Sequence, residues 1–195
     1  NDIISGFELV RSHLALETAD YVKSLLSIDL YEPEDKTDFS ANTRYSRIKA
    51  AYLCCLFRAG FTVPEGIKIK FEGNAQLNSL VKSDGSIDPS KGISLEQATN
   101  WFITIWENYD DDPYFANYRR DKGHEWADED LKALLIFLSR KTKPGASNAT
   151  ISGYLKLRSL KDLHTATVGK PFEQEIIEEL RKGRIIIIDL SQGDP

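Results

Sequence analysis

Methionine and cysteine are the residues that this sequence has least of. The chain of 195 residues contains no methionine and two cysteines, Cys54 and Cys55. The two cysteines are adjacent within a helical pattern, so their side chains point in different directions. This pair cannot build a disulfide framework, and it lacks the ligand spacing of a zinc site. We therefore interpret both residues as buried thiols of a protein in a reducing compartment.

Long apolar runs are also missing. No run approaches the length that a membrane-spanning helix requires, and the first residues do not follow the pattern of a signal peptide. A hydrophobic fraction of 41% and a charged fraction of 28% are typical of a globular protein. We expect a cytoplasmic protein without a membrane partner.

Positive charge is in the minority. The formal net charge of −5 excludes a chain-wide basic surface for nucleic acid. Basic side chains nevertheless gather in two places, on a predicted helix and on a later segment. They are Arg44, Arg47, Lys49 and Arg58, and then Arg119, Arg120 and Lys122. Either group could contact phosphate. The acidic surroundings favour a solvated helix face opposite the apolar stripe.

Motifs that carry chemistry are absent from the sequence. There is no phosphate-binding loop, no dinucleotide fingerprint and no local Ser/His/Asp or Cys/His set. Residues 84–88 begin like a calcium loop, but Pro89 replaces the required glycine and Leu95 replaces the closing glutamate. His124 begins a motif like that of zinc proteases, but Asp128 stands where the second histidine belongs. The sequence therefore predicts no metal site and no catalytic residue.

Helical periodicity is the main pattern that the sequence does contain. Apolar residues recur at every third or fourth position in six segments. The predicted helices cover residues 3–28, 40 or 42 to 59, 74–81, 94–109, 127–140, and 147 or 148 to 160. Ser5, Asn74 and Ser94 are the predicted N-caps, and Gly60 ends the second helix. Residues 67–71 alternate and could form a short edge strand. The fold class is therefore mainly α, with a bundle-like domain of several helices over residues 3–160.

The last part of the chain has a different pattern. Residues 171–183 predict a short helix with acids toward its start, Arg181 and Lys182 at its end, and Gly183 as a left-handed cap. Four consecutive isoleucines follow, at positions 185–188. A continuous β-branched run is typical of a parallel strand that is buried on both faces. A single apolar strand of this kind is not stable when it is exposed to water. We therefore expect the chain to be part of a larger α/β domain.

This closing segment resembles a stretch of the HerA-type ATPases, which are relatives of the FtsK-like DNA pumps. In that family a short helix leads through a glycine into a buried strand that ends in Asp-Leu-Ser, often followed by Gln-Gly-Asp. The same order occurs here from Asp189 to Asp194. The resemblance implies that Asp189 and Ser191 lie near nucleotide, at the carboxyl edge of a RecA-like sheet.

The resemblance also implies a domain organisation. Residues 1–165 would be a helical insertion domain, and residues 166–195 would be a helix and strand of the P-loop ATPase core. The phosphate loop would lie upstream in the parent protein and the acidic ATPase motif downstream. ATP and Mg²⁺ would be cofactors of the parent, with no cofactor expected in this fragment.

Two functions remain open on this basis. In the first, the parent is a hexameric DNA translocase or helicase, and this piece provides packing, ring contacts or a surface for a nuclease or other effector partner. The fragment alone, which lacks the nucleotide motifs, would have no activity. In the second, the chain is a free-standing helical protein-interaction module without catalytic activity.

Overall fold

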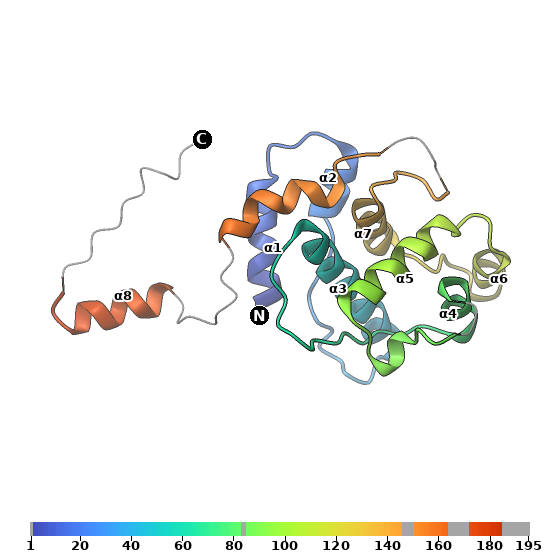
Figure 1. The fold of residues 1–195 in the computed structure, drawn as a ribbon, viewed down its shortest axis with the longest axis horizontal. Coiled ribbons are helices and arrows are strands. Elements are labelled where there is room, and N and C mark those ends of the chain that lie inside the picture. Colours follow the sequence, from blue (N-terminus) through green and yellow to red (C-terminus); the bar gives the residue numbers. More distant parts are fainter. Residues whose placement is uncertain (1, 83–84, 146–149, 164–171, 185–195) are drawn as a thin grey trace. The chain divides into compact units, whose positions relative to one another are not determined.

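The computed structural model describes residues 2–82, 85–145, 150–163 and 172–184. It is mainly helical, as the sequence predicts (Figure 1). The elements in chain order are α1 (Asp2–His13), α2 (Asp20–Leu26), α3 (Phe39–Ala59), α4 (Ala75–Val81), η1 (Pro89–Lys91), α5 (Leu95–Glu107), α6 (Pro113–Lys122), α7 (Glu129–Ser139), η2 (Gly153–Leu163) and α8 (Phe172–Arg181). Residues 1–164 and 165–195 form two compact units. We call the described part of the first unit the helical body.

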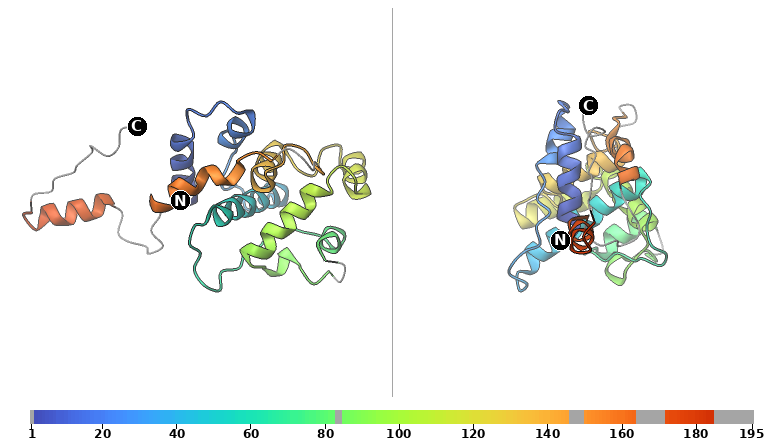
Figure 2. Two further views of the ribbon diagram at one scale, coloured as in Figure 1. Left: turned by 45° about the horizontal axis from the view of Figure 1, so that its top comes forward. Right: turned by 90° about the vertical axis from the view of Figure 1, so that its left-hand side faces the viewer.

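The centre of the helical body is α3, its longest helix. It packs against α5, α7 and η2, which come from distant parts of the sequence (Figures 1 and 2). Its N-cap is Asp38, whose carboxylate accepts a hydrogen bond from Ala41 N, and it ends at Gly60 in the left-handed conformation. The predicted stop at Gly60 is therefore confirmed. The predicted start at Ser40 or Asn42 is wrong by a few residues, because Asp38 provides the cap.

Two neighbouring helices match the sequence pattern closely. Ser94 and Gln97 form the predicted capping box at the start of α5. The apolar stripes of α5 and α7 are buried as predicted. Their buried members include Ala98, Trp101, Phe102, Ile105, Trp106, Leu131, Leu134, Leu135 and Leu138. The hydrophobic core therefore lies where α3, α5 and α7 meet.

The first predicted helix is divided in two by the structure. Residues 14–19 separate α1 from α2, although Leu14 is buried on the predicted apolar face. Ser5 lies inside α1 and is not its N-cap, because the helix already begins at Asp2. The stretch after Asp112 is the helix α6, which the periodicity does not predict. Asp112 caps it and Pro113 occupies its first position.

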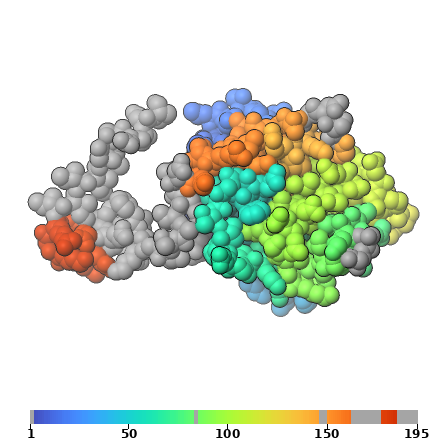
Figure 3. Space-filling view, in the orientation of Figure 1, coloured from blue at the N-terminus to red at the C-terminus, as the bar shows by residue number. Residues whose placement is uncertain are grey.

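Strand structure is almost absent from the described ranges. The alternating residues 67–71 contribute only an isolated antiparallel bridge between Ile69 and Ile93. The last predicted helix of the body appears as the 3-10 helix η2, which begins at Gly153. In Figure 3, η2 (orange) lies on the surface between blue atoms from the first part of the chain and teal atoms from the end of α3 and the chain after it. It contacts α1, α3 and α7.

In the second unit, α8 ends as the sequence predicts. Gly183 has a φ of 72°. Its N–H donates to Leu180 O at 2.9 Å, and Arg184 N donates to Glu179 O at 3.1 Å. These two bonds form a Schellman motif, which requires a left-handed residue at the glycine position. The predicted strand at 185–188, with Asp189 and Ser191, lies outside the described residues.

The two cysteines are buried free thiols, as predicted. Cys54 Sγ donates to Leu95 O on α5, and Cys55 Sγ donates to Leu134 O on α7, each at 3.9 Å. Burial raises the pKa of Cys54 from 9.0 to about 12, and it raises the pKa of Cys55 well above 9.0.

These raised pKa values predict alkaline destabilisation. Above pH 9 the thiols ionise in the unfolded chain but stay protonated in the folded one, so rising pH favours unfolding until the folded pKa is reached. Between pH 8 and pH 10 we expect a loss of about 1.4 kcal/mol for each thiol. Urea unfolding of the native chain and of a Cys54→Ala/Cys55→Ala variant, at both pH values, measures this loss. Equal losses in the two proteins would contradict the assignment.

Candidate functional site

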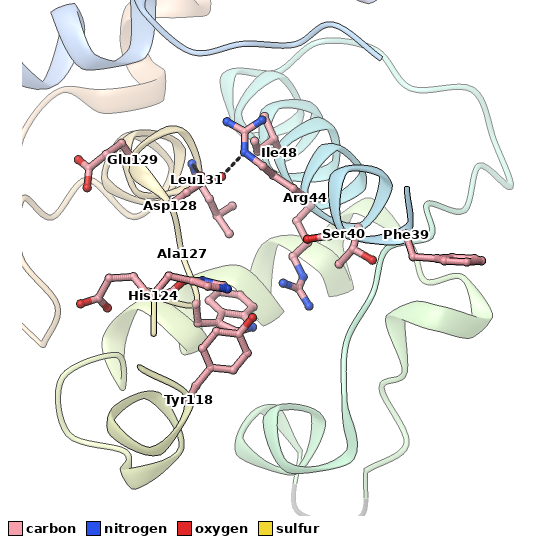
Figure 4. Close-up of a pocket in the computed structure, with 14 residues that line it drawn as sticks. Phe39, Ser40, Arg44, Ile48, Tyr118, His124, Ala127, Asp128, Glu129 and Leu131 are labelled. Carbon is pink, nitrogen blue, oxygen red and sulfur yellow. Dashed lines mark hydrogen bonds and ion pairs between the residues drawn. The ribbon is translucent and has the colours of Figure 1, made fainter. Parts of the chain in front are cut away.

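A cleft opens beside the first turns of α3, and we call it the Arg47 cleft. Its volume is about 730 Å³. On the α3 wall, polar side chains recur at spacings of three and four residues and therefore share one helix face. They are Ser40, Thr43, Arg44 and Arg47, with Phe39 and Ile48 beside them. Figure 4 shows Ser40 on the α3 wall and Tyr118 on the opposite wall, whereas the ring of Phe39 points away from the cleft.

The opposite wall combines the end of α6, the loop that follows it and the start of α7. Gly123, with a φ of 75°, ends α6 and turns the chain into this loop. The cleft-lining residues of this wall are Tyr118, His124, Glu125, Trp126, Ala127, Asp128, Glu129 and Leu131. The backbone of the loop is fixed by Tyr109, whose hydroxyl accepts from Ala127 N at 3.1 Å and donates to Glu125 Oε2 at 3.0 Å. The wall is therefore anchored in the aromatic core.

Arg44 ties the two walls together. Its guanidinium forms ion pairs with Asp128 and Asp130, and the first of these is drawn in Figure 4. Asp128 also accepts from Leu131 N and thereby caps α7. Burial alone would lower the pKa of Arg44, but the two carboxylates raise it above its usual value. The charge of Arg44 is therefore balanced within the protein.

Arg47 is the other cation of the cleft, and its environment is different. Its Cζ lies 4.9 Å from the centroid of the Trp126 ring, and its Nε donates to Glu72 O at 2.9 Å. Within the described part of the chain, no carboxylate pairs with this guanidinium. Burial consequently lowers the pKa of Arg47. Among the described residues this partly buried charge is therefore not neutralised by an ion pair.

Trp126 is the most buried polar group of the cleft. It is 4% exposed and packs against Trp101, Tyr109 and Phe115. Its indole Nε1 is buried and has no hydrogen-bond partner among the described residues. Such orphaned donors are rare in folded proteins, so this N–H is available to a water or a ligand in the cleft.

The structure brings together several residues that the sequence singled out for other reasons. Arg44 and Arg47 line the same cleft as His124 and Asp128, which are the first and last positions of the incomplete zinc-protease motif. Two of the remaining basic residues have partners outside α3: Arg58 donates to Tyr154 Oη at 2.9 Å, and Arg119 pairs with Glu125 at 2.8 Å. Arg44 and Arg58 are exposed, as a solvated face requires, whereas Arg47 is only partly exposed and lies over the Trp126 ring.

Asp189 and Ser191, the residues that the resemblance places near nucleotide, lie outside the described residues. Sequence reasoning did not find Tyr118, Trp126, Ser40 or Thr43 as members of a site. The spacing of Ser40, Thr43 and Arg47 on one helix face was a usable signal for the α3 wall. Nothing in the sequence connects Trp126 to Arg47, because that contact depends on the tertiary fold.

Another pair of side chains has the form of a nucleophile and a base. Ser159 Oγ lies 2.9 Å from His13 Nε2, and both residues are at the surface. In the described chain no carboxylate orients the other ring nitrogen of His13. The pair therefore lacks the third member of a catalytic triad.

The described residues were also compared with the requirements of metal sites and membrane helices. No group of three or more His, Cys, Asp or Glu side chains in the described ranges could hold a metal ion. None of the helices described has the length and apolar character needed to cross a bilayer. Comparisons with protein-family models, with curated proteins and with solved structures found no match.

Proposed function

We propose that this chain is part of a HerA-type ATPase and that its helical body is an insertion in the ATPase core. The observation that carries the proposal is the order of a short helix, a glycine, an isoleucine run and Asp-Leu-Ser-Gln-Gly-Asp from Asp189 to Asp194. The Schellman motif at Gly183 supports it, because it supplies the sharp helix end that must precede such a strand. The division of the chain into two compact units, residues 1–164 and 165–195, also supports an insertion.

In this proposal the parent protein is a hexameric ring that translocates or unwinds DNA. ATP would be hydrolysed between subunits, with Mg²⁺ and backbone amides holding the phosphates and an arginine stabilising the transferred charge. Asp189 and Ser191 would lie close to that nucleotide. The helical body would provide ring contacts or a surface for an effector such as a nuclease. The phosphate loop would come from the longer protein, since this chain has none.

A specific observation also favours the alternative of a free-standing interaction module. The helical body buries a core of its own around α3, α5 and α7. A unit with a complete core can fold and bind a partner without an ATPase domain in the same chain.

An ATPase assay on the full-length gene product and on this chain tests the leading proposal. We expect hydrolysis by the full-length protein and none by this chain, which lacks the phosphate loop. In the full-length protein, Asp189→Asn should lower the hydrolysis rate by about tenfold or more, because it removes a charge beside the nucleotide. Glu34→Gln, which changes an exposed acid of the helical body, is the matched control.

Two results would overturn the proposal. If neither protein hydrolyses ATP, the helical module is the better description. If Asp189→Asn behaves like Glu34→Gln in an active full-length protein, the Asp-Leu-Ser segment is not beside the nucleotide.

A further inference from the structure

The unbalanced charge of Arg47 is the starting point. Its guanidinium can donate five hydrogen bonds, and within the described ranges only the Nε hydrogen has an acceptor, Glu72 O. The remaining four N–H groups belong to a side chain that lines the Arg47 cleft. A partly buried cation with unused donors is costly unless an anion completes it.

Other hydrogen-bond donors line the same cleft. Thr43 and Ser40 lie about one and two turns before Arg47 on the same face of α3, and both line the cleft. The positive end of the α3 dipole is at this end of the helix, because α3 begins at Phe39. The orphaned N–H of Trp126 belongs to the opposite wall.

The carboxylates of the cleft do not cancel this positive field. Asp128 is paired with Arg44, and Glu125 with Arg119. The side chain of Glu129 is 94% exposed and lies 3.5 Å from Lys132. Arg47 is therefore the cation of the cleft that an external anion can neutralise.

Size and wall chemistry narrow the class of anion. The volume of about 730 Å³ is in the range of small-molecule sites and is much larger than an isolated phosphate needs. Tyr118 supplies an aromatic surface in the same cleft as Arg47. The His124 ring lies edge-on to the Tyr118 ring, with 5.5 Å between the ring centroids. Aromatic side chains of this kind stack on nucleobases irrespective of base identity.

We propose that the Arg47 cleft binds a nucleotide, with its phosphate on Arg47, Ser40 and Thr43 and its base against Tyr118. The nucleotide is either free or part of a single strand, since both present the same phosphate and base. The proposal rests on the cleft alone and does not depend on the ATPase assignment, whose nucleotide would be bound elsewhere.

Calorimetric titration of the whole chain with AMP, adenosine and inorganic phosphate tests the proposal. AMP should bind, and adenosine should bind about tenfold or more weakly because it lacks the charge-assisted hydrogen bonds. Inorganic phosphate should also bind more weakly than AMP, because it cannot contact Tyr118. A short oligodeoxyadenylate that binds more tightly than AMP would identify a single strand as the source, and one that binds no more tightly would identify the free nucleotide.

Arg47→Gln should weaken AMP binding by about tenfold or more. The matched control is Arg58→Gln. Arg58 is on the same helix and its Cζ lies 5.0 Å from the centroid of the Tyr154 ring, but it does not line the cleft. If Arg47→Gln does not fold, as judged by circular dichroism, Thr43→Val provides the second variant; it preserves side-chain shape and should weaken AMP binding severalfold. No binding of AMP to the native chain, or equal binding by the Arg47→Gln and Arg58→Gln variants, would overturn the proposal.

Discussion

Replacing Gly153 with alanine is expected to destabilise the helical body by about 3 kcal/mol or more. Gly153 has a φ of 51°, and a Cβ atom there would lie 2.4 Å from Phe137 O and 2.9 Å from Arg140 Cγ. The arginine side chain can move away, but the Phe137 backbone is held in α7 by a ring with no exposed surface. Left-handed strain and a backbone clash therefore act together.

Urea unfolding measures this loss, and Gly66→Ala is its control. Gly66 also has a positive φ, of 76°, but no atom lies within 4 Å of the position that its Cβ would take. Alanine there should cost only the left-handed strain, about 1 kcal/mol. Similar losses at the two positions would show that η2 can move away from α7 and that the contact is not tight.

Truncating Trp101 to alanine should cost about 3–5 kcal/mol, which is the range for large aromatic residues in a core. Trp101 has no exposed surface and contacts Phe71 and Phe102 edge-on, with centroid distances of 5.1 and 5.2 Å. Its Nε1 donates to Asn78 Oδ1 at 3.0 Å, and Asn78 is itself only 5% exposed. The substitution therefore creates a cavity and leaves a buried acceptor unpaired.

Trp101→Phe separates these two contributions. It retains most of the apolar contact but removes the donor to Asn78, so a loss of about 1–3 kcal/mol is expected from thermal or urea unfolding. Phe39→Ala is the control, because Phe39 is 83% exposed and its truncation should change stability by less than about 0.5 kcal/mol. A Trp101→Phe protein as stable as the native chain would show that the buried hydrogen bond contributes nothing.

The parts of the fold that could be predicted are those with local signals. Ser94 with Gln97, Asn74, Gly60 and Gly183 each fix a helix end through bonds to residues a few positions away. The α5 and α7 stripes follow from periodicity because each helix buries a single face. These features depend on neighbours in sequence, and sequence contains that information.

The parts that were missed depend on competing or distant interactions. The break between α1 and α2 contains no glycine or proline, and Leu14 continues the apolar stripe across it. The helix α6 has an N-cap, Asp112, but only Phe115 is buried on it, so its periodicity is weak. The role of Arg47 was not predictable, because its partner Trp126 is contributed by a loop that only the fold brings near.

The central position of α3 has a consequence for how the chain is made. This helix is buried by α5, α7 and η2, and all three are synthesised after it. During translation, the apolar face of α3 is therefore exposed at first and is fully covered only after α5, α7 and η2 have all left the ribosome. The N-terminal half of the helical body therefore cannot complete its fold one helix at a time. We expect chaperones to bind nascent chains that are stalled before Gly153.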